Sequence, residues 1–190
     1  MADYFVDGDD ALENKLGITN PDELKAAEQE IVANKSADIL SEAPQSFDQI
    51  YLLHIHNVLF EDIYDFAGTI RTVDIAKPDA SAPFAHAQFI EAEAERIFRD
   101  LADKDYLTRF DHENFVVELA NLAAELNALH PFREGNGRTI RLFLIMLADH
   151  AGYLLDYSRV SAEEIISADK LAFEGNDKAL LSLYGKVVAE

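Results

Sequence analysis

The stretch HPFREGNGRTIR, residues 130–141, gathers side chains that can act on a phosphate ester. His130 can take a proton from a hydroxyl group near neutral pH. Glu134 would repel a phosphate unless a cation lay between them, and Mg²⁺ commonly bridges carboxylate and phosphate oxygens. Arg138 and Arg141 lie three residues apart, on one face of a helix, where both can fork onto phosphate oxygens. Together these are the parts that phosphoryl or nucleotidyl transfer requires.

The bend GNG, residues 135–137, is suited to hold the anion. Its glycines allow positive φ and close approach of the backbone, and Asn136 adds a side-chain donor. A helix that begins near Arg138 presents unpaired N–H groups with a partial positive charge. Each piece also has a structural explanation: Asn-Gly is a turn signal, His before Pro is often a helix cap, and arginines can pair with acids. Their joint spacing favours the site, and neither GxxxxGK(S/T) nor GxGxxG occurs.

Length and composition restrict the class of protein. The chain has 190 residues, 16 basic against 36 acidic, and a formal charge of −20, which argues against nucleic acid or anionic lipid as partner. The absence of cysteine excludes disulfides, thiolate zinc sites and cysteine nucleophiles. The start is acidic rather than signal-like, and the apolar run 142–148 is too short to span a bilayer. We expect one cytoplasmic domain over 1–190, with its core at about 10–185 and the first dozen residues frayed.

Helix signals dominate the chain that must position the motif. Caps at Asn20, Ser46, Asp111 and Ser161 open four of the expected helices, and an amphipathic stripe ends on His130. The expected helices cover 21–40, from the Ser46 cap to about 68, 87–104, 112–130, 138–152, 162 onward and 177–188. Residues 69–84 are β-branched and then turn-rich, which predicts a small β-hairpin or flap. The fold class is therefore all-α with one small hairpin.

HPFREGNGRTIR matches the Fic family signature HxFx(D/E)GNGRxxR at every defined position. NKLGITNPDELKAAEQEIV and LFEDIYDFAGTIRTVDI are also similar to Fic-domain sequence and occur in the right order, so the resemblance covers about residues 10–185. It implies a Fic fold, a helical bundle around a buried central helix with a β-hairpin flap. The implied reaction is AMPylation, in which a Ser, Thr or Tyr hydroxyl attacks the α-phosphate of ATP and pyrophosphate leaves.

The resemblance also implies a role for each motif residue. His130 would deprotonate the target hydroxyl, Phe132 would anchor the loop, and Glu134 would hold Mg²⁺. The remaining residues would bind the ATP phosphates: Gly135, Asn136 and Gly137 as an anion hole, Arg138 on the β-phosphate side and Arg141 at the γ-phosphate. The flap would pair with an extended target segment by β-augmentation, through Thr72, Val73, Asp74, Ile75, Ala76 and Lys77. A structural hairpin that only covers the core is the alternative.

Other polar residues carry weaker signals. Arg71 and Lys77 flank the flap and could touch phosphates or target, or could be solvated surface. His54 and His56 lie two apart on a helix and cannot share a face, so we interpret them as structural rather than as a zinc pair. Transfer of another nucleotide or phosphate-containing group, and a non-catalytic nucleotide-binding regulator, are the alternative functions. The intact GNGR favours AMP, and a mere binder has no need of a base at His130.

The resemblance to the Fic family also implies how the activity would be inhibited and which proteins would be modified. Fic proteins restrain themselves with a helix bearing (S/T)xxxE(G/N), whose glutamate pairs with the second motif arginine, here Arg141. Residues 19–23 fit but are followed by Leu24, and Glu174 is preceded by Lys170 where a hydroxyl residue is required. We therefore expect a helical antitoxin-like protein to supply the glutamate in trans. The likeness to stand-alone bacterial Fic toxins implies a target such as DNA gyrase or another topoisomerase, and effector-type Fic domains imply a host GTPase after delivery into a host cell.

Overall fold

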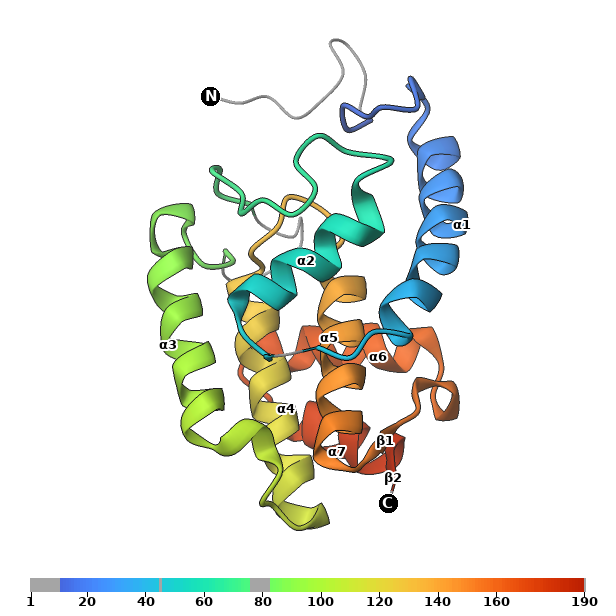
Figure 1. The fold of residues 1–190 in the computed structure, drawn as a ribbon. Coiled ribbons are helices and arrows are strands. Elements are labelled where there is room, and N and C mark those ends of the chain that lie inside the picture. Colours follow the sequence, from blue (N-terminus) through green and yellow to red (C-terminus); the bar gives the residue numbers. More distant parts are fainter. Residues whose placement is uncertain (1–10, 45, 76–82, 190) are drawn as a thin grey trace.

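A computed structural model describes residues 11–44, 46–75 and 83–189 (Figure 1). In this described part the chain forms α1 (Pro21–Leu40), α2 (Gln49–Phe60), α3 (Ile90–Asp103), α4 (His112–Leu129), α5 (Asn136–Ala151), α6 (Ala162–Phe173) and α7 (Lys178–Val187). Short 3₁₀ turns occupy Ala87–Phe89, Asp105–Leu107 and Tyr157–Arg159. β1 (Leu154–Leu155) pairs antiparallel with β2 (Val188–Ala189), with Leu154 opposite Ala189. No helix of the described residues is both long and apolar enough to cross a membrane.

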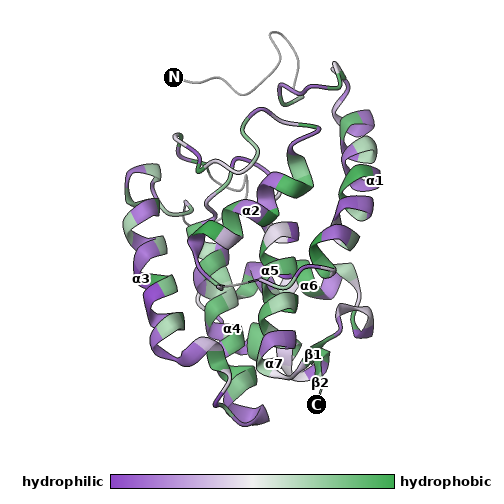
Figure 2. Ribbon diagram, viewed as in Figure 1, coloured by the Kyte–Doolittle hydropathy of each residue, from purple (hydrophilic) through white to green (hydrophobic). Residues whose placement is uncertain are grey.

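Helix α5 lies at the centre of the bundle. It packs against α1, α2, α4 and β1, while α3 packs on α4 and α7 packs on α4 and α6 (Figure 1). The buried residues of α5 run along most of its length, as expected for a helix that is apolar nearly all round: Asn136, Thr139, Ile140, Leu142, Phe143, Leu144, Met146, Leu147 and Ala148. Figure 2 shows hydrophobic residues concentrated on α4 and α5 and many hydrophilic ones on α3. The predicted all-α bundle around a buried central helix is confirmed.

Local capping chemistry explains most helix starts. Asn20 accepts hydrogen bonds from the first N–H groups of α1, and Asp111 accepts one at the start of α4. Ser161 and Glu164 form the predicted capping box of α6. These three predictions are confirmed.

The second predicted helix differs at both ends. Asp48, not Ser46, caps α2, because its Oδ1 accepts from the Tyr51 N–H at 2.9 Å, whereas the Ser46 hydroxyl donates to Asp48 Oδ2 at 2.8 Å. The helix ends at Phe60 rather than at Gly68. Turns follow, and Gly68 adopts φ +72°.

The predicted hairpin is wrong for the described part of the flap. Residues 69–75 contain no strand, and the sheet of the described residues joins β1 to β2 instead. Side chains rather than a strand ladder hold this segment: Arg71 donates to the Val73 carbonyl at 2.7 Å, and Asp74 Oδ1 accepts from the Ala87 N–H at 2.7 Å. Ala76 and Lys77 lie outside the described residues. So does most of the segment predicted to fray, residues 1–10, while Ala11 is buried.

Candidate functional site

The loop between α4 and α5 carries the motif and begins at His130. This residue ends α4 in the left-handed conformation, φ 45° and ψ 62°, with its N–H donating to the Leu126 carbonyl. Its Nδ1 lies 3.2 Å from the Asn127 carbonyl oxygen. When Nδ1 donates that hydrogen bond, the neutral ring carries its lone pair on Nε2. The Phe84 ring stacks on the imidazole at 3.7 Å between centroids, so one face of His130 is covered.

The loop is shaped from inside by a buried asparagine. Asn136 Oδ1 accepts from the Phe132 N–H at 2.9 Å, and Nδ2 donates to the Phe132 carbonyl at 2.8 Å. The side-chain donor expected to face an anion is therefore engaged within the loop, which corrects that part of the prediction. Gly135, at φ 79°, precedes the first turn of α5. The N–H groups of that turn have no acceptor inside the helix, so they can bind an anion.

His56 supports the loop from α2. It is fully buried, accepts at Nδ1 from the Gly68 N–H at 2.8 Å and donates from Nε2 to the Glu134 carbonyl at 3.1 Å. Burial lowers the pKa of His56 to about 4, so the ring is neutral and the tautomer is fixed. The ring also stacks on Phe132 at 3.8 Å, and Phe132 is buried as predicted. The structural interpretation of His56 is confirmed, and no cluster of three or more metal-ligating side chains exists among the described residues.

All the phosphate-binding candidates except Asn136 line one cavity of about 560 Å³. Glu134, Gly135, Gly137, Arg138 and Arg141 line it from the loop and the start of α5. The opposite wall comes from the N-terminal segment, α1, Tyr64 and α6, through Ala11, Leu12, Pro21, Leu24, Lys25, Glu28, Gln29 and Ile166. Five of the predicted motif residues are thus brought together.

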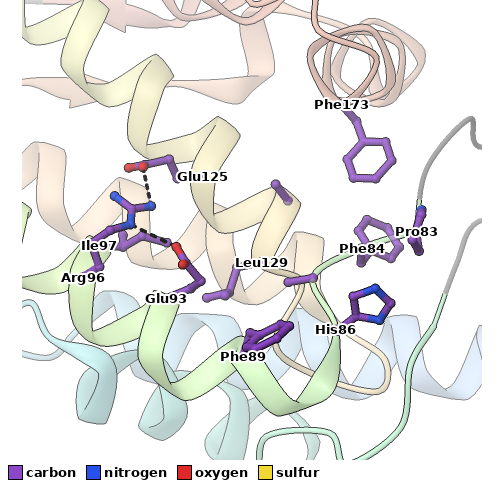
Figure 3. Close-up of a pocket in the computed structure, with 12 residues that line it drawn as sticks. Pro83, Phe84, His86, Phe89, Glu93, Arg96, Ile97, Glu125, Leu129 and Phe173 are labelled. Carbon is purple, nitrogen blue, oxygen red and sulfur yellow. Dashed lines mark hydrogen bonds and ion pairs between the residues drawn. The ribbon is translucent and has the colours of Figure 1, made fainter.

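A second cavity, of about 540 Å³, is lined by residues 83–86, by residues of α3 and α4, and by Phe173 of α6 (Figure 3). Phe84 lines this cavity and also stacks on His130, while Phe89 and Phe173 add further aromatic walls. The described flap residues run toward it, because Asp74 Oδ2 lies 2.8 Å from Nδ1 of His86, another lining residue. The Ala87 N–H and His86 both lower the pKa of the Asp74 carboxyl. His130 is therefore adjacent to the flap, and the candidate anion cradle (Gly135, Gly137, Arg138 and Arg141) faces α1.

Sequence reasoning missed Glu28 of α1. This carboxylate is 6% exposed, forms an ion pair with Arg138 and accepts from the Tyr64 hydroxyl at 2.5 Å. The Arg138 guanidinium also lies over the Phe60 ring, 5.0 Å from its centre, a distance at which a cation and an aromatic face attract. A signal was present, because position 28 falls on the same helix face as Leu24 and Val32, both buried. A charged residue on an apolar stripe indicates a buried partner.

Known proteins resemble the whole chain. The family model described as "Fic/DOC family" matches residues 46–148. "Probable protein adenylyltransferase Fic" of Escherichia coli (strain K12) is 36% identical over 187 residues, 98% of this chain and 92% of that protein. "Protein adenylyltransferase VbhT" of Bartonella schoenbuchensis is 36% identical over 178 residues, 93% of this chain and 37% of that protein. Among solved structures, the BepC effector protein of Bartonella tribocorum with bound AMPPNP has a TM-score of 0.95 at 28% identity, covering 98% of this chain and 96% of that one.

Proposed function

The chain belongs to the Fic/DOC family, and on that premise we propose that it is a protein adenylyltransferase. It transfers AMP from ATP to a Ser, Thr or Tyr hydroxyl of a target protein. The observation that carries the proposal is the intact motif folded with a histidine at the end of α4 and a glycine-arginine cradle at the start of α5. Relatives named as adenylyltransferases and a BepC structure holding an ATP analogue support it.

In this proposal the reaction is a single displacement at the α-phosphorus. The target oxygen forms a bond to that phosphorus, and the bond to the oxygen bridging the α- and β-phosphates breaks, releasing pyrophosphate. His130 Nε2 receives the hydroxyl proton, with the ring oriented by its Nδ1 contact to the Asn127 carbonyl. The backbone of Gly135, Asn136 and Gly137 and the first turn of α5 cradle the α- and β-phosphates.

The two motif arginines bind the rest of the triphosphate. Both line the 560 Å³ cavity. Glu28 and the Phe60 ring hold Arg138 in place, so its guanidinium is oriented before the β-phosphate arrives. Arg141, one turn further along α5, binds the γ-phosphate.

Glu134 is the proposed ligand for Mg²⁺. Its Oε1 accepts from the Gly135 N–H at 2.8 Å, and its side chain is 46% exposed on the same cavity as the anion cradle. An accessible carboxylate oxygen beside a phosphate site fits the oxygen ligands that Mg²⁺ takes, together with substrate phosphates. The cation, when bound, supplies charge neutralisation on the phosphates.

Replacing Glu134 by alanine should weaken ATP binding more in the presence of Mg²⁺ than in its absence, since the carboxylate is the proposed ligand of the cation, although its Oε1 also contacts the Gly135 N–H and the Arg138 guanidinium. Calorimetric titration of both proteins with ATP, with Mg²⁺ and with EDTA, measures this. Asp65→Ala is the matched control, because that exposed carboxylate contacts Lys15 and lies outside the cavity lining. If ATP affinity is independent of Mg²⁺ in both proteins, Glu134 does not bind the metal.

The target docks on the flap in this proposal. Thr72 and Asp74 are exposed, Val73 and Ile75 are half-buried, and Asp74 contacts His86, which lines the second cavity. A target strand would align along Thr72 to Ile75 and continue over Ala76 and Lys77. We propose a bacterial toxin acting in the cytoplasm on DNA gyrase or another topoisomerase, with a host GTPase as target if the chain is delivered as an effector. Transfer of another nucleotide by the same site and a non-catalytic nucleotide-binding role are the competing functions.

Labelled ATP separates these functions. The purified chain is incubated with ATP labelled on the α-phosphate, and separately on the γ-phosphate, with and without bacterial lysate. Protein-bound AMP in the α-labelled sample alone supports adenylyl transfer, and mass spectrometry of the labelled protein then identifies the target and residue. Label from the γ-phosphate indicates phosphoryl transfer, and nucleotide binding without any labelled protein indicates a regulator.

We propose that inhibition comes from a helical antitoxin-like partner. The cavity that holds Arg141 is walled by α1 and by Ile166, which is 65% exposed, so a partner helix packed there could reach Arg141 with a glutamate. Glu28 is not the inhibitory glutamate, because it forms its ion pair with Arg138 and not with Arg141. The described lining of this cavity includes neither Glu23 nor Glu174.

The purified chain should therefore modify itself without activation. Glu23→Gly and Glu174→Gly should each leave autoAMPylation unchanged, because neither glutamate lines the cavity that holds Arg141. Expression of the wild-type chain alone should be toxic to bacteria, and His130→Ala should relieve the toxicity. A large rise in autoAMPylation from either glycine variant would show a built-in inhibitor and would contradict the partner proposal.

A further inference from the structure

Arg71 is buried beneath the flap. It is 2% exposed and is the largest of the fully buried side chains among the described residues. It is therefore not solvated surface, and a phosphate in solution cannot contact it. Its guanidinium donates four hydrogen bonds, all to main-chain carbonyls. Nε donates to His130 at 2.8 Å, NH1 to Val73 at 2.7 Å, and NH2 to Ala85 at 2.5 Å and to Leu129 at 3.4 Å.

These carbonyls belong to two functional segments. Leu129 and His130 close α4, where the last carbonyls of a helix lack intrahelical partners and favour a cation. Val73 lies on the flap before residues 76–82, and Ala85 directly follows the flap. Main-chain bonds reinforce the junction, from the Arg71 N–H to the Pro131 carbonyl at 2.9 Å and from the Ala85 N–H to the Ala128 carbonyl at 3.1 Å. The Arg71 side chain therefore joins the segments before and after residues 76–82 to the main chain of Leu129 and His130.

We propose that Arg71 is a positioning residue that sets the distance between the docked target hydroxyl and His130. The proposal rests on the adenylyltransferase function proposed above. The position of a target strand on the flap depends on the backbone at Val73 and Ala85, and the position of the imidazole depends on the backbone at His130. Arg71 binds the carbonyls of all three residues and so holds these positions relative to each other. It also stabilises the left-handed backbone at His130, a conformation that a residue other than glycine seldom adopts.

Only arginine fits this role. The planar guanidinium presents five N–H groups in fixed directions, so it can reach carbonyls on three sides at once. A lysine ammonium at the same place keeps the charge but gathers its donors on one atom. Arg71→Lys should therefore weaken the connection between the flap and the end of α4, while the side chain still fills the core.

The test compares Arg71→Lys and Arg71→Ala with Arg99→Lys, whose parent arginine is exposed and pairs with Glu95 on the same helix. Arg71→Lys should lower kcat for transfer to the target by about 10²-fold, the scale expected for a displacement near 1 Å at a reacting centre. The dissociation constant for ATP should not change, because Arg71 does not line the cavity of the anion cradle. Arg99→Lys should match the wild type in both quantities.

Folding and catalysis are separated by two further readouts. Thermal unfolding and circular dichroism establish that each variant is folded before its kinetics are interpreted. Guanidinium added at millimolar concentration to Arg71→Ala should restore transfer in part and should not affect Arg71→Lys, whose side chain fills the space. Rescue of this kind supports the proposal even if Arg71→Ala alone is less stable.

The outcomes are distinct. Wild-type kcat in folded Arg71→Lys overturns the proposal, and so does a loss of ATP affinity that parallels the loss of transfer, since that indicates a general structural role. A wild-type chain that never transfers AMP to any protein contradicts the proposed function instead. Under that outcome the ATP titrations still show whether Arg71 is independent of the nucleotide site.

Discussion

His130→Ala will lose transfer by about 10²–10⁴-fold, the contribution typical of a general base, and will still bind ATP. The residue stacks on Phe84 beside the flap, and the 560 Å³ cavity is lined by the arginines and glycines of the motif rather than by the imidazole. Removing the ring therefore removes the proton acceptor and leaves the nucleotide cradle in place. Single-turnover transfer with labelled ATP measures the first effect, and calorimetry measures the second.

The control for this substitution is His54→Ala. That histidine is partly exposed on α2 and pairs with Glu42 at 2.8 Å, so its loss should affect neither quantity. Wild-type transfer rates in His130→Ala would rule out the assignment of the base. A parallel loss of ATP binding would mean that the imidazole belongs to the nucleotide cradle.

Gly135→Ala should be more disruptive to the fold than any other single methyl group added to the motif. Gly135 has φ +79°, and a Cβ there would overlap the buried Phe60 ring. The positive φ costs about 1–2 kcal/mol for alanine, and overpacking of a filled core costs about 1–3 kcal/mol more. Phe60 also supports the Arg138 guanidinium, so the ring cannot move without disturbing the phosphate site. Chemical denaturation and ATP titration should both show the loss.

Gly152→Ala is the matched control for the glycine substitution. It has φ +88° at the end of α5, and nothing lies within 4 Å of a Cβ placed there. Its destabilisation therefore reports the backbone conformation alone, and the excess in Gly135→Ala reports the clash with Phe60. Equal destabilisation of the two variants would show that the loop does not approach Phe60 as described.

The features that sequence predicted are those set by near neighbours in the chain. The Asn20, Asp111 and Ser161 caps need only residues within one turn, and the apolar character of α5 is visible along the helix itself. The cradle was predictable for the same reason, because its residues lie within eight positions, 134–141. Local periodicity and capping suffice where the partner is close in sequence.

The supporting contacts were missed because their partners are distant in sequence. Arg71 and the His130 carbonyl are 59 residues apart, and His56 and the Glu134 carbonyl are 78 apart. Nothing local distinguishes a buried arginine in a β-branched segment from a solvated one beside a hairpin, so Arg71 remained undecided and the hairpin was predicted where side chains hold the backbone. Glu28 differs, since its place on the apolar stripe of α1 was readable without a structure.

Glu28 also links the opening of α1 to the state of the nucleotide site. The helix buries four residues, Leu24, Glu28, Val32 and Ile39, and one of these four is a carboxylate bound to Arg138. Local unfolding of α1 and ligand occupancy at α5 are then coupled equilibria, and each must shift the other by the same factor. Amide hydrogen exchange in α1 consequently reports how the triphosphate uses Arg138. Slower exchange on binding means that phosphate and Glu28 share the arginine, and faster exchange means that phosphate displaces the carboxylate and loosens the helix.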